Sequence, residues 1–162
     1  MTLISTTMEK LKIAVASDHA GYERKQAVLK YLQANGYEFR DFGAFSTESS
    51  DYPDYAHPLA NAVSAGEFDL GITLCGSGNG INMTANKHQG IRSALCWMPE
   101  IAQLARKHNN ANVCALPARF ITDEEAIEIV RFFYQPNLKV VAILPELTRS
   151  QFRKCLFRKK YF

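Results

Sequence analysis

The chain has 162 residues, which fits one domain and is long enough to bury a hydrophobic core. Hydrophobic residues make up 47% and charged residues 22%, as in an ordinary globular protein, and the formal net charge of +3 arises mainly between Arg149 and Lys160. The rest of the chain shows no basic face of the kind that binds nucleic acid, and no apolar run approaches the roughly 20 residues of a membrane helix, so we expect neither partner.

The N-terminal residues 1–10 lack the apolar segment and cleavage site of a secretory signal. Four cysteines, Cys75, Cys96, Cys114 and Cys155, occur without CxxC pairs, which argues against a zinc site and against a disulfide scaffold. We therefore expect reduced thiols, a cytoplasmic location, and no metal ion or other cofactor.

Strand-length apolar runs alternate with segments of helical periodicity along most of the chain. The predicted strands are Lys12–Ala16, Tyr37–Phe42, Leu70–Leu74, Arg92–Trp97 and Val113–Leu116. The predicted helices are Gly21–Asn35, Asp54–Ala65, Ile81–Lys87, Glu100–Lys107 and Asp123–Tyr134, the last with Thr122 as its N-cap. Such alternation gives parallel strands with right-handed crossovers. We predict an α/β fold over residues 1–136: a doubly wound, Rossmann-like three-layer sandwich with a five-stranded parallel sheet.

The segments just past the predicted strands are the candidate site, because open α/β sheets bind ligands at the carboxyl ends of their strands. Ser17-Asp18-His19-Ala20-Gly21 follows the first strand and Cys75-Gly76-Ser77-Gly78-Asn79-Gly80 follows the third. Arg119 follows the fifth strand, and His108-Asn109-Asn110 leads into it.

The glycine-rich stretch Cys75–Gly80 is the strongest local signal. Successive backbone N–H groups ahead of a helix form an anion cradle, and glycines let a ligand approach closely. A tight strand-to-helix turn would favour the same glycines, so spacing alone leaves both interpretations open. The pattern G-x-G-x-G after a third strand also differs from the G-x-G-x-x-G of dinucleotide-binding proteins.

Cys75 stands at the strand end beside this cradle, where N–H dipoles favour a thiolate. The alternative, a small buried hydrophobe, is the interpretation that we accept for Cys96 and Cys114.

The histidines are harder to interpret on their own. Asp18 and His19 are either site residues or an N-cap with an incidental histidine, and His108 is either a site residue or a helix-end histidine that interacts with the helix dipole. We expect His57, inside a predicted helix, to be structural, and His88 has no evident role.

Several motifs together resemble the type B ribose-5-phosphate isomerases. They are Ser17-Asp18-His19-Ala20-Gly21, Asp51-Tyr52-Pro53-Asp54-Tyr55-Ala56, the Cys75–Gly80 stretch, Ala85-Asn86-Lys87 and His108-Asn109-Asn110-Ala111-Asn112. They occur in the family's order and cover about residues 11 to 136.

The resemblance implies an aldose–ketose isomerase that interconverts ribose 5-phosphate and ribulose 5-phosphate through an enediolate. It implies that Cys75 moves the proton between C2 and C1, and that His108 protonates the ring oxygen to open the furanose. Ser77 and Asp18 would assist proton traffic and hydroxyl positioning.

The resemblance also assigns the binding contacts. The enediolate oxygens would accept hydrogen bonds from the loop N–H groups of Gly76, Gly78, Asn79 and Gly80. His19 and Arg119 would bind the phosphate, while Tyr52 and Asn109 would line the sugar site. The family needs no metal and builds each site across a homodimer interface, with His108 and Arg119 coming from the neighbouring subunit.

Two alternatives stay open. The first is an isomerase for a six-carbon aldose 6-phosphate, such as galactose 6-phosphate or allose 6-phosphate. The second is a non-catalytic phosphate-binding module that uses the same cradle, although such a module needs neither Cys75 nor His108.

The chain departs from the family's pattern after residue 136. The family normally ends with Phe-Glu-Gly-Gly-Arg-His followed shortly by another arginine, and both arginines bind phosphate; neither is in place here. Synonymous codons can be chosen for residues 137–150 that, when translated from the third base of the first codon, give Phe-Glu-Gly-Gly-Arg-His-Leu-Thr-Arg. We therefore hypothesise that residues 137–162 form an atypical, frameshifted tail, and we assign neither Arg149 nor Arg153 to the site.

Overall fold

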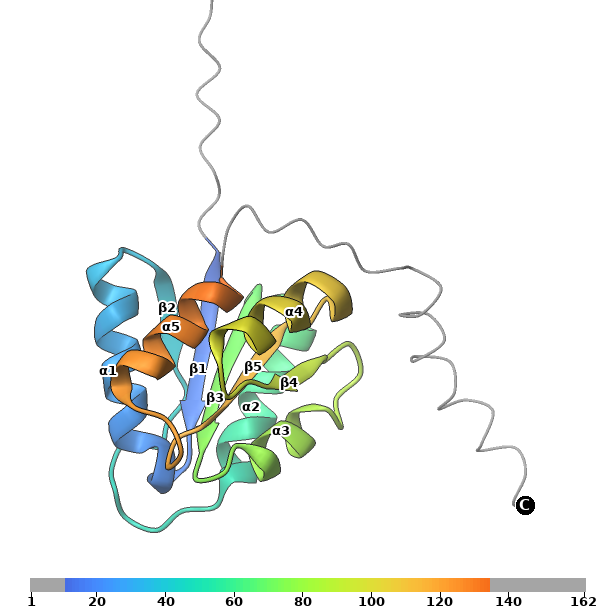
Figure 1. Cartoon of the computed structure of the whole chain (residues 1–162). Coiled ribbons are helices and arrows are strands. Elements are labelled where there is room, and N and C mark those ends of the chain that lie inside the picture. The colour runs from blue at the N-terminus through green and yellow to red at the C-terminus, as the bar shows by residue number, and fades with distance from the viewer. Residues whose placement is uncertain (1–10, 135–162) are drawn as a thin grey trace, which may run out of the picture.

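The structure, a computed structural model, describes residues 11–134 (Figure 1). The predictions for residues 1–10, for Cys155 and for the tail 137–162 lie outside the described residues. The strands are β1 Lys12–Ser17, β2 Glu38–Asp41, β3 Leu70–Cys75, β4 Ser93–Leu95 and β5 Val113–Pro117. The helices are α1 Tyr22–Ala34, α2 Tyr52–Ser64, α3 Asn79–Ala85, α4 Pro99–Asn109 and α5 Asp123–Phe133, and a 3-10 turn at His19–Gly21 precedes α1.

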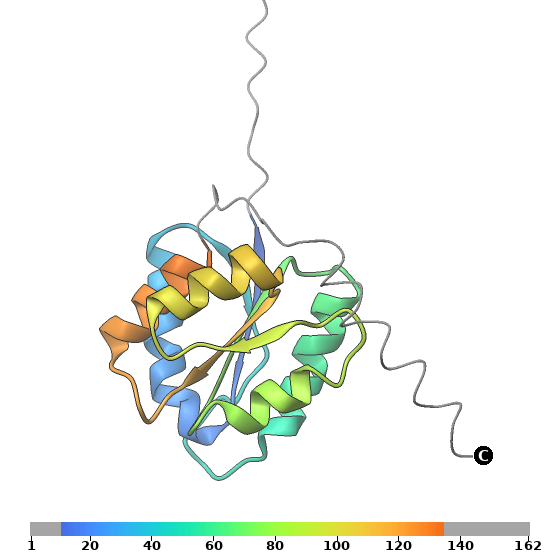
Figure 2. The same ribbon diagram turned by 45° about the vertical axis from the view of Figure 1, so that its right-hand side comes forward.

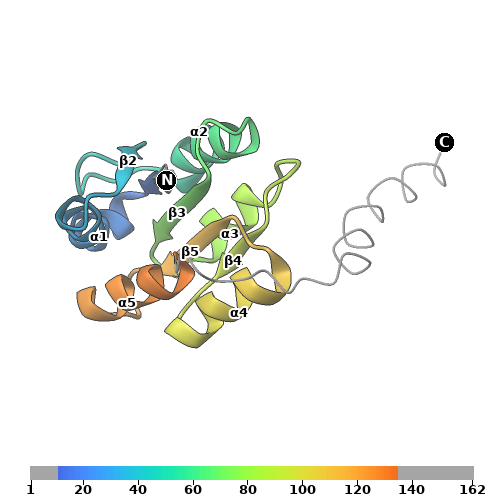
Figure 3. The same ribbon diagram turned by 90° about the horizontal axis from the view of Figure 1, so that it is seen from above.

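All five strands are parallel and lie in the order β2-β1-β3-β5-β4. Helices α1, α4 and α5 cover one face of the sheet, and α2 and α3 cover the other (Figure 3). The predicted doubly wound, three-layer α/β architecture is therefore confirmed.

The central strands are predictable because both of their faces are buried. Ile13 and Val15 of β1 contact the core beneath α1 and α5, whereas the alternating residues Ala14 and Ala16 pack beneath α2. Every residue of β3 and β5 is likewise buried. This continuous burial produces the near-continuous apolar runs seen in the sequence.

Most element boundaries differ from the prediction by one or two residues, and two of these differences are informative. Strand β4 pairs with β5 only from Ser93 to Leu95, although the apolar run continues to Trp97, which is 54% exposed. Helix α2 begins at Tyr52, two residues earlier than expected, with Pro53 in its first turn, where the missing N–H of proline costs nothing. Both differences lie at the carboxyl edge of the sheet, where the candidate site is found.

Candidate active site

The site forms where neighbouring connections of the sheet run in opposite directions. From β1 the chain crosses through α1 to β2 on one side, whereas from β3 it crosses through α3 toward the other edge. Loops that diverge in this way leave a crevice at the carboxyl ends of the two strands. Asp18 and His19 follow β1 there, and Cys75 ends β3.

Backbone hydrogen bonds tie the loops of three strands together at this edge. Asp18 N–H donates to Leu74 O at 3.2 Å, which joins the ends of β1 and β3. Ala118 N–H donates to Cys75 O, and Arg119 N–H donates to Gly76 O, both at 3.0 Å. The candidate residues after β1, β3 and β5 are thus held in one rigid cluster.

The Cys75–Gly80 loop is shaped by Gly78. Its φ of 75° is left-handed, and a β-carbon there would lie 2.4 Å from Leu95 Cδ1 and 3.1 Å from the main chain of Leu116. Within the described part of the chain, the N–H groups of Gly76 and Gly80 donate no hydrogen bond. Unpaired N–H groups in a glycine-rich loop suit an anionic oxygen.

Other groups of the same loop are partly engaged. Ser77 Oγ accepts hydrogen bonds from Asn79 N–H at 3.3 Å and from Asn79 Nδ2 at 3.4 Å. Both side chains are exposed at the mouth of the loop. The side chains of Ser77 and Asn79 can therefore give up these hydrogen bonds to each other and bind a polar ligand instead.

Cys75 is only 4% exposed and packs with Ala56, Ile81 and Ala115. The other described thiols, Cys96 and Cys114, are fully buried in the larger core, and burial raises the pKa of Cys114 well above its usual value. The interpretation of these two cysteines as core residues is confirmed.

Arg119 lies beside the glycine loop of its own chain. A β-carbon built on Gly76 would lie 3.5 Å from Arg119 Cδ, Nε and Nη1. The expectation that Arg119 reaches the site from a neighbouring subunit is therefore wrong for the position seen here, because the turn after β5 directs its side chain toward β3 of the same chain.

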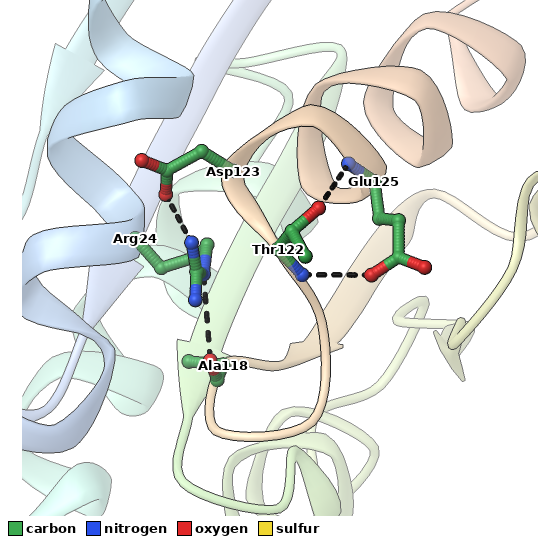
Figure 4. A network of polar contacts seen from close by, with 5 residues as sticks. All are labelled: Arg24, Ala118, Thr122, Asp123 and Glu125. Carbon is green, nitrogen blue, oxygen red and sulfur yellow. Dashed lines mark hydrogen bonds and ion pairs between the residues drawn. The ribbon is translucent and has the colours of Figure 1, made fainter.

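The turn that carries Arg119 is fixed on both sides (Figure 4). Arg24 of α1 donates to Ala118 O at 3.4 Å and forms an ion pair with Asp123 at the start of α5. Thr122 and Glu125 form the reciprocal bonds of a capping box, at 3.2 and 2.7 Å, which confirms Thr122 as the N-cap. These contacts hold Arg119 between two anchored ends.

On the β1 side, His19 and Asp18 have distinct surroundings. His19 Nδ1 lies 3.1 Å from Ser50 N and 2.9 Å from Ser50 O, so its position is set by the loop that precedes α2. Asp18 Oδ1 accepts from Gly21 N–H at 3.0 Å and caps the 3-10 turn. Asp18 therefore has the structural role that sequence left open, and its location keeps it next to the site.

His108 and Asn109 lie away from this cluster. They end α4, which runs back along the sheet and delivers them to the amino end of β5. Strand β3 has six residues, so at about 3.3 Å per residue the two edges are roughly 20 Å apart. Both side chains are exposed. One chain therefore does not bring His108 or Asn109 to Cys75.

Sequence reasoning missed a buried lysine that supports the site. Lys25 is fully buried, and its Nζ donates to both carboxylate oxygens of Asp41 at 2.7 and 2.8 Å and to Ala44 O at 2.6 Å. Burial lowers the pKa of Lys25, and the Asp41 carboxylate opposes this shift. This ion pair anchors the loop that carries Ser50 toward Tyr52. The one signal in the sequence is the spacing of Lys25 from Val28 and Leu32, which places the lysine on the buried face of α1.

Within residues 11–134, no three His, Cys, Asp or Glu side chains gather where they could hold a metal ion. No helix in the same range is long and apolar enough to cross a membrane.

Fold and site together define an α/β protein that presents a cysteine and a glycine-rich, N–H-lined loop at a topological switch point. Comparison with known proteins agrees with this class. Residues 13–142 match the family model described as Ribose/Galactose Isomerase, and the chain belongs to this family.

Individual relatives are similar over most of their length. The chain is 45% identical to ribose-5-phosphate isomerase B of Escherichia coli (strain K12) over 119 residues, 74% of this chain and 80% of that protein. It is 41% identical to ribose-5-phosphate isomerase B of Mycobacterium tuberculosis (strain ATCC 25618 / H37Rv) over 151 residues, 88% of this chain and 93% of the relative.

Solved structures of the same kind superpose well. A ribose 5-phosphate isomerase from Thermotoga maritima gives a TM-score of 0.76 at 50% identity and covers 77% of this chain and 86% of its own. Ribose-5-phosphate isomerase B from Mycoplasma genitalium, with bound ribulose-5-phosphate, gives 0.79 at 35% identity and covers 92% and 97%. The resemblance inferred from the motifs is confirmed.

Proposed function

We propose that this chain is an aldose–ketose isomerase that interconverts ribose 5-phosphate and ribulose 5-phosphate. The observation that carries the proposal is the position of Cys75 at the switch point, beside unpaired N–H groups, in a chain of the ribose/galactose isomerase family. The relative with bound ribulose-5-phosphate supports this choice of substrate.

In the proposed mechanism, Cys75 removes the C2 proton of the open-chain aldose and returns it to C1, while the proton of the O2 hydroxyl passes to O1. The negative charge that develops on the enediolate oxygens would be stabilised by the unpaired loop N–H groups of Gly76 and Gly80, whereas the Gly78 N–H donates to Cys75 O at 3.2 Å. Ser77, Asp18 and Asn79 contribute polar groups around the sugar.

The same proposal assigns the substrate contacts at this edge. His19, held by Ser50, and Arg119, beside Gly76, would bind the phosphate. Tyr52 would line the sugar site. Asn109 would line it from a second copy of the chain.

A homodimer with shared sites is the second part of the proposal, because His108 lies about one strand length from Cys75 in a single chain. A two-fold arrangement side by side along the β4 edge would put the carboxyl edge of one sheet next to the amino edge of the other. That edge is flanked by α3 and α4 (Figure 2). It exposes large apolar side chains: Met83, Trp97, Met98 and Leu104.

Complementation tests the shared site. Cys75→Ala and His108→Ala are each expected to lower turnover, by about 10²–10⁴-fold for loss of an acid or base. Dissociating and re-pairing an equal mixture should restore about one quarter of the wild-type sites, since half the dimers are mixed and each has one intact site. A mixture no more active than its components contradicts the shared site, whereas a Cys75→Ala protein as active as wild type contradicts the proposed function.

Substrate choice is tested by turnover. Comparison of ribose 5-phosphate with allose 6-phosphate and galactose 6-phosphate separates a five-carbon from a six-carbon isomerase. Turnover on the six-carbon substrates alone contradicts the proposal, and phosphate binding without any turnover indicates a binding module. We also predict a cytoplasmic location, in keeping with the three free thiols among the described residues.

We propose that residues 137–162 are translated from a shifted reading frame. The encoding DNA tests it directly: a shifted frame that does not encode Gly-Gly-Arg-His contradicts it. Replacing residues 140–146 by Gly-Gly-Arg-His-Leu-Thr-Arg should lower the KM for ribose 5-phosphate, because charge-assisted hydrogen bonds contribute roughly 1.5–3 kcal/mol each.

A further inference from the structure

The segment that carries His108 and Asn109 ends in a left-handed turn. Asn110 has φ 47° and ψ 43°, a conformation that asparagine tolerates better than most residues. Its N–H donates to Arg106 O at 3.1 Å, and Ala111 N–H donates to Ala105 O at 3.0 Å. The chain therefore reverses directly after Asn109, whose carbonyl oxygen has no partner within the helix.

Two guanidinium groups bind the carbonyl oxygens on either side of Asn110. Arg92 Nε donates to Asn109 O at 2.5 Å, and Arg106 Nη1 donates to Ala111 O at 2.6 Å. Arg106 Nη1 also lies 3.4 Å from Asn110 Oδ1. Cationic donors at a helix C-terminus satisfy its free carbonyls and complement its dipole. Arg92 and Arg106 together clamp the turn.

Both arginines are themselves anchored to the body of the fold. Asn112 at the entry to β5 accepts from Arg92 N–H at 2.8 Å and donates its own N–H to Arg92 O at 3.0 Å. The guanidinium of Arg106 lies 5.7 Å from the ring centroid of Phe133 in α5. The two side chains line a cavity of about 360 Å³ at the amino ends of β1 and β3. The turn is thus held in a fixed position relative to the sheet and to α5.

We propose that Arg92 and Arg106 are positioning residues for the half of the active site that carries His108 and Asn109. The inference rests on the proposed function, in which His108 of one copy protonates the ring oxygen of a sugar bound at Cys75 of the other. A general acid must lie within hydrogen-bond distance of its target. A displacement of about 1 Å costs about 10²-fold in rate, so a rigid turn matters although neither arginine contacts the substrate.

The experiment follows two reactions in Arg106→Gln and in Arg92→Gln. Isomerisation of ribose 5-phosphate requires ring opening. Exchange of a C1 hydrogen of ribulose 5-phosphate with solvent deuterium requires only proton transfer at Cys75, because a ketose with a phosphorylated C5 oxygen has no furanose form. Arg131→Gln is the matched control, since it removes an exposed arginine that pairs with Glu128 at 2.9 Å.

Both glutamine variants are expected to lose about 10- to 10²-fold in isomerisation while C1 exchange stays within about threefold of wild type. Arg92→Lys and Arg106→Lys, which keep a cationic donor, should recover part of the rate and serve in place of any glutamine variant that does not fold. Wild-type isomerisation, or an equal loss of both reactions, overturns the proposal. A wild-type protein that catalyses neither reaction refutes the proposed function instead.

Discussion

The ring of Tyr52 lies across Gly80, so closely that a β-carbon on Gly80 would stand 2.6 Å from Tyr52 Cζ. Tyr52 opens α2 and Gly80 lies in the first turn of α3, and these two helices pack together over one face of the sheet. The glycine is therefore required by a neighbouring side chain rather than by its own backbone conformation. The contact also places a phenol at the mouth of the Cys75 loop.

Gly80→Ala should displace this ring. Because Tyr52 is 38% exposed, its side chain has room to move aside, and we expect little change in the thermal midpoint. The KM for ribose 5-phosphate should rise by about two- to tenfold, the equivalent of one lost hydrogen bond. The double variant with Tyr52→Ala should be no worse than Tyr52→Ala alone, since both changes remove one contact. Additive effects in steady-state kinetics would show that Gly80 acts independently of Tyr52.

Gly78 and Gly66 form a matched pair for a stability measurement. Both have left-handed φ angles, 75° and 78°, but a β-carbon on Gly66 has no neighbour within 4 Å, whereas one on Gly78 meets Leu95 and main-chain atoms of Leu116 and Pro117 in β5. We expect Gly66→Ala to cost about 1–2 kcal/mol for its backbone conformation alone. Gly78→Ala should cost a further ~1–3 kcal/mol because of the close contacts. Equal losses in urea unfolding would contradict the packing argument.

Sequence predicted the elements that are buried on both faces and the motifs that are contiguous. Strands β1, β3 and β5 were identified to within a residue, because covered parallel strands need apolar side chains at every position. The loop from Cys75 to Gly80 was predictable for a similar reason, since the groups that we propose to bind the ligand are main-chain atoms of nearly consecutive residues.

Contacts that depend on the direction of an element were not predictable in the same way. Helix α4 ends at the amino end of β5, so His108 lies at the edge of the sheet opposite Cys75, and the sequence does not show how the two could share a site. Ser50 holds His19 through its main-chain N and O atoms, so the identity of residue 50 gives no signal of this contact in the sequence. The pairing of Lys25 with Asp41 likewise required the structure, because it joins α1 to β2 across a tertiary contact.

Cys75 should be the most reactive of the described thiols. Cys96 and Cys114 are fully buried and so shielded from reagents, and burial raises the pKa of Cys114 well above its usual value. Iodoacetamide labelling followed by peptide mass spectrometry should modify Cys75 before Cys96 and Cys114, and ribulose 5-phosphate should slow that modification. Cys96→Ala, a change outside the site, should leave the rate at Cys75 unchanged. Labelling of Cys114 as fast as Cys75 would refute this assignment.

A pair of neighbouring histidines lies outside the site. His57 of α2 and His88, just past α3, approach with Nδ1 and Nε2 2.8 Å apart and ring centroids 5.1 Å apart. One ring nitrogen must donate and the other accept, so the contact requires at least one neutral imidazole. The histidine that sequence left without a role thus joins the two helices that frame the contact between Tyr52 and Gly80.

This pair should make the protein less stable in mild acid. Burial, and secondly the proximity of His57, lower the pKa of His88 below its usual 6.5. Below about pH 6.5 the unfolded chain therefore binds more protons than the folded one, and stability is lost as the pH falls through the window between the two pKa values. His88→Asn should flatten the decline of the thermal midpoint from about pH 7 to about pH 5. His57→Asn, which removes the second cause while leaving the burial, should flatten it only in part. If the His88→Asn protein loses its thermal midpoint as steeply as wild type over this range, other titrating groups govern the acid sensitivity.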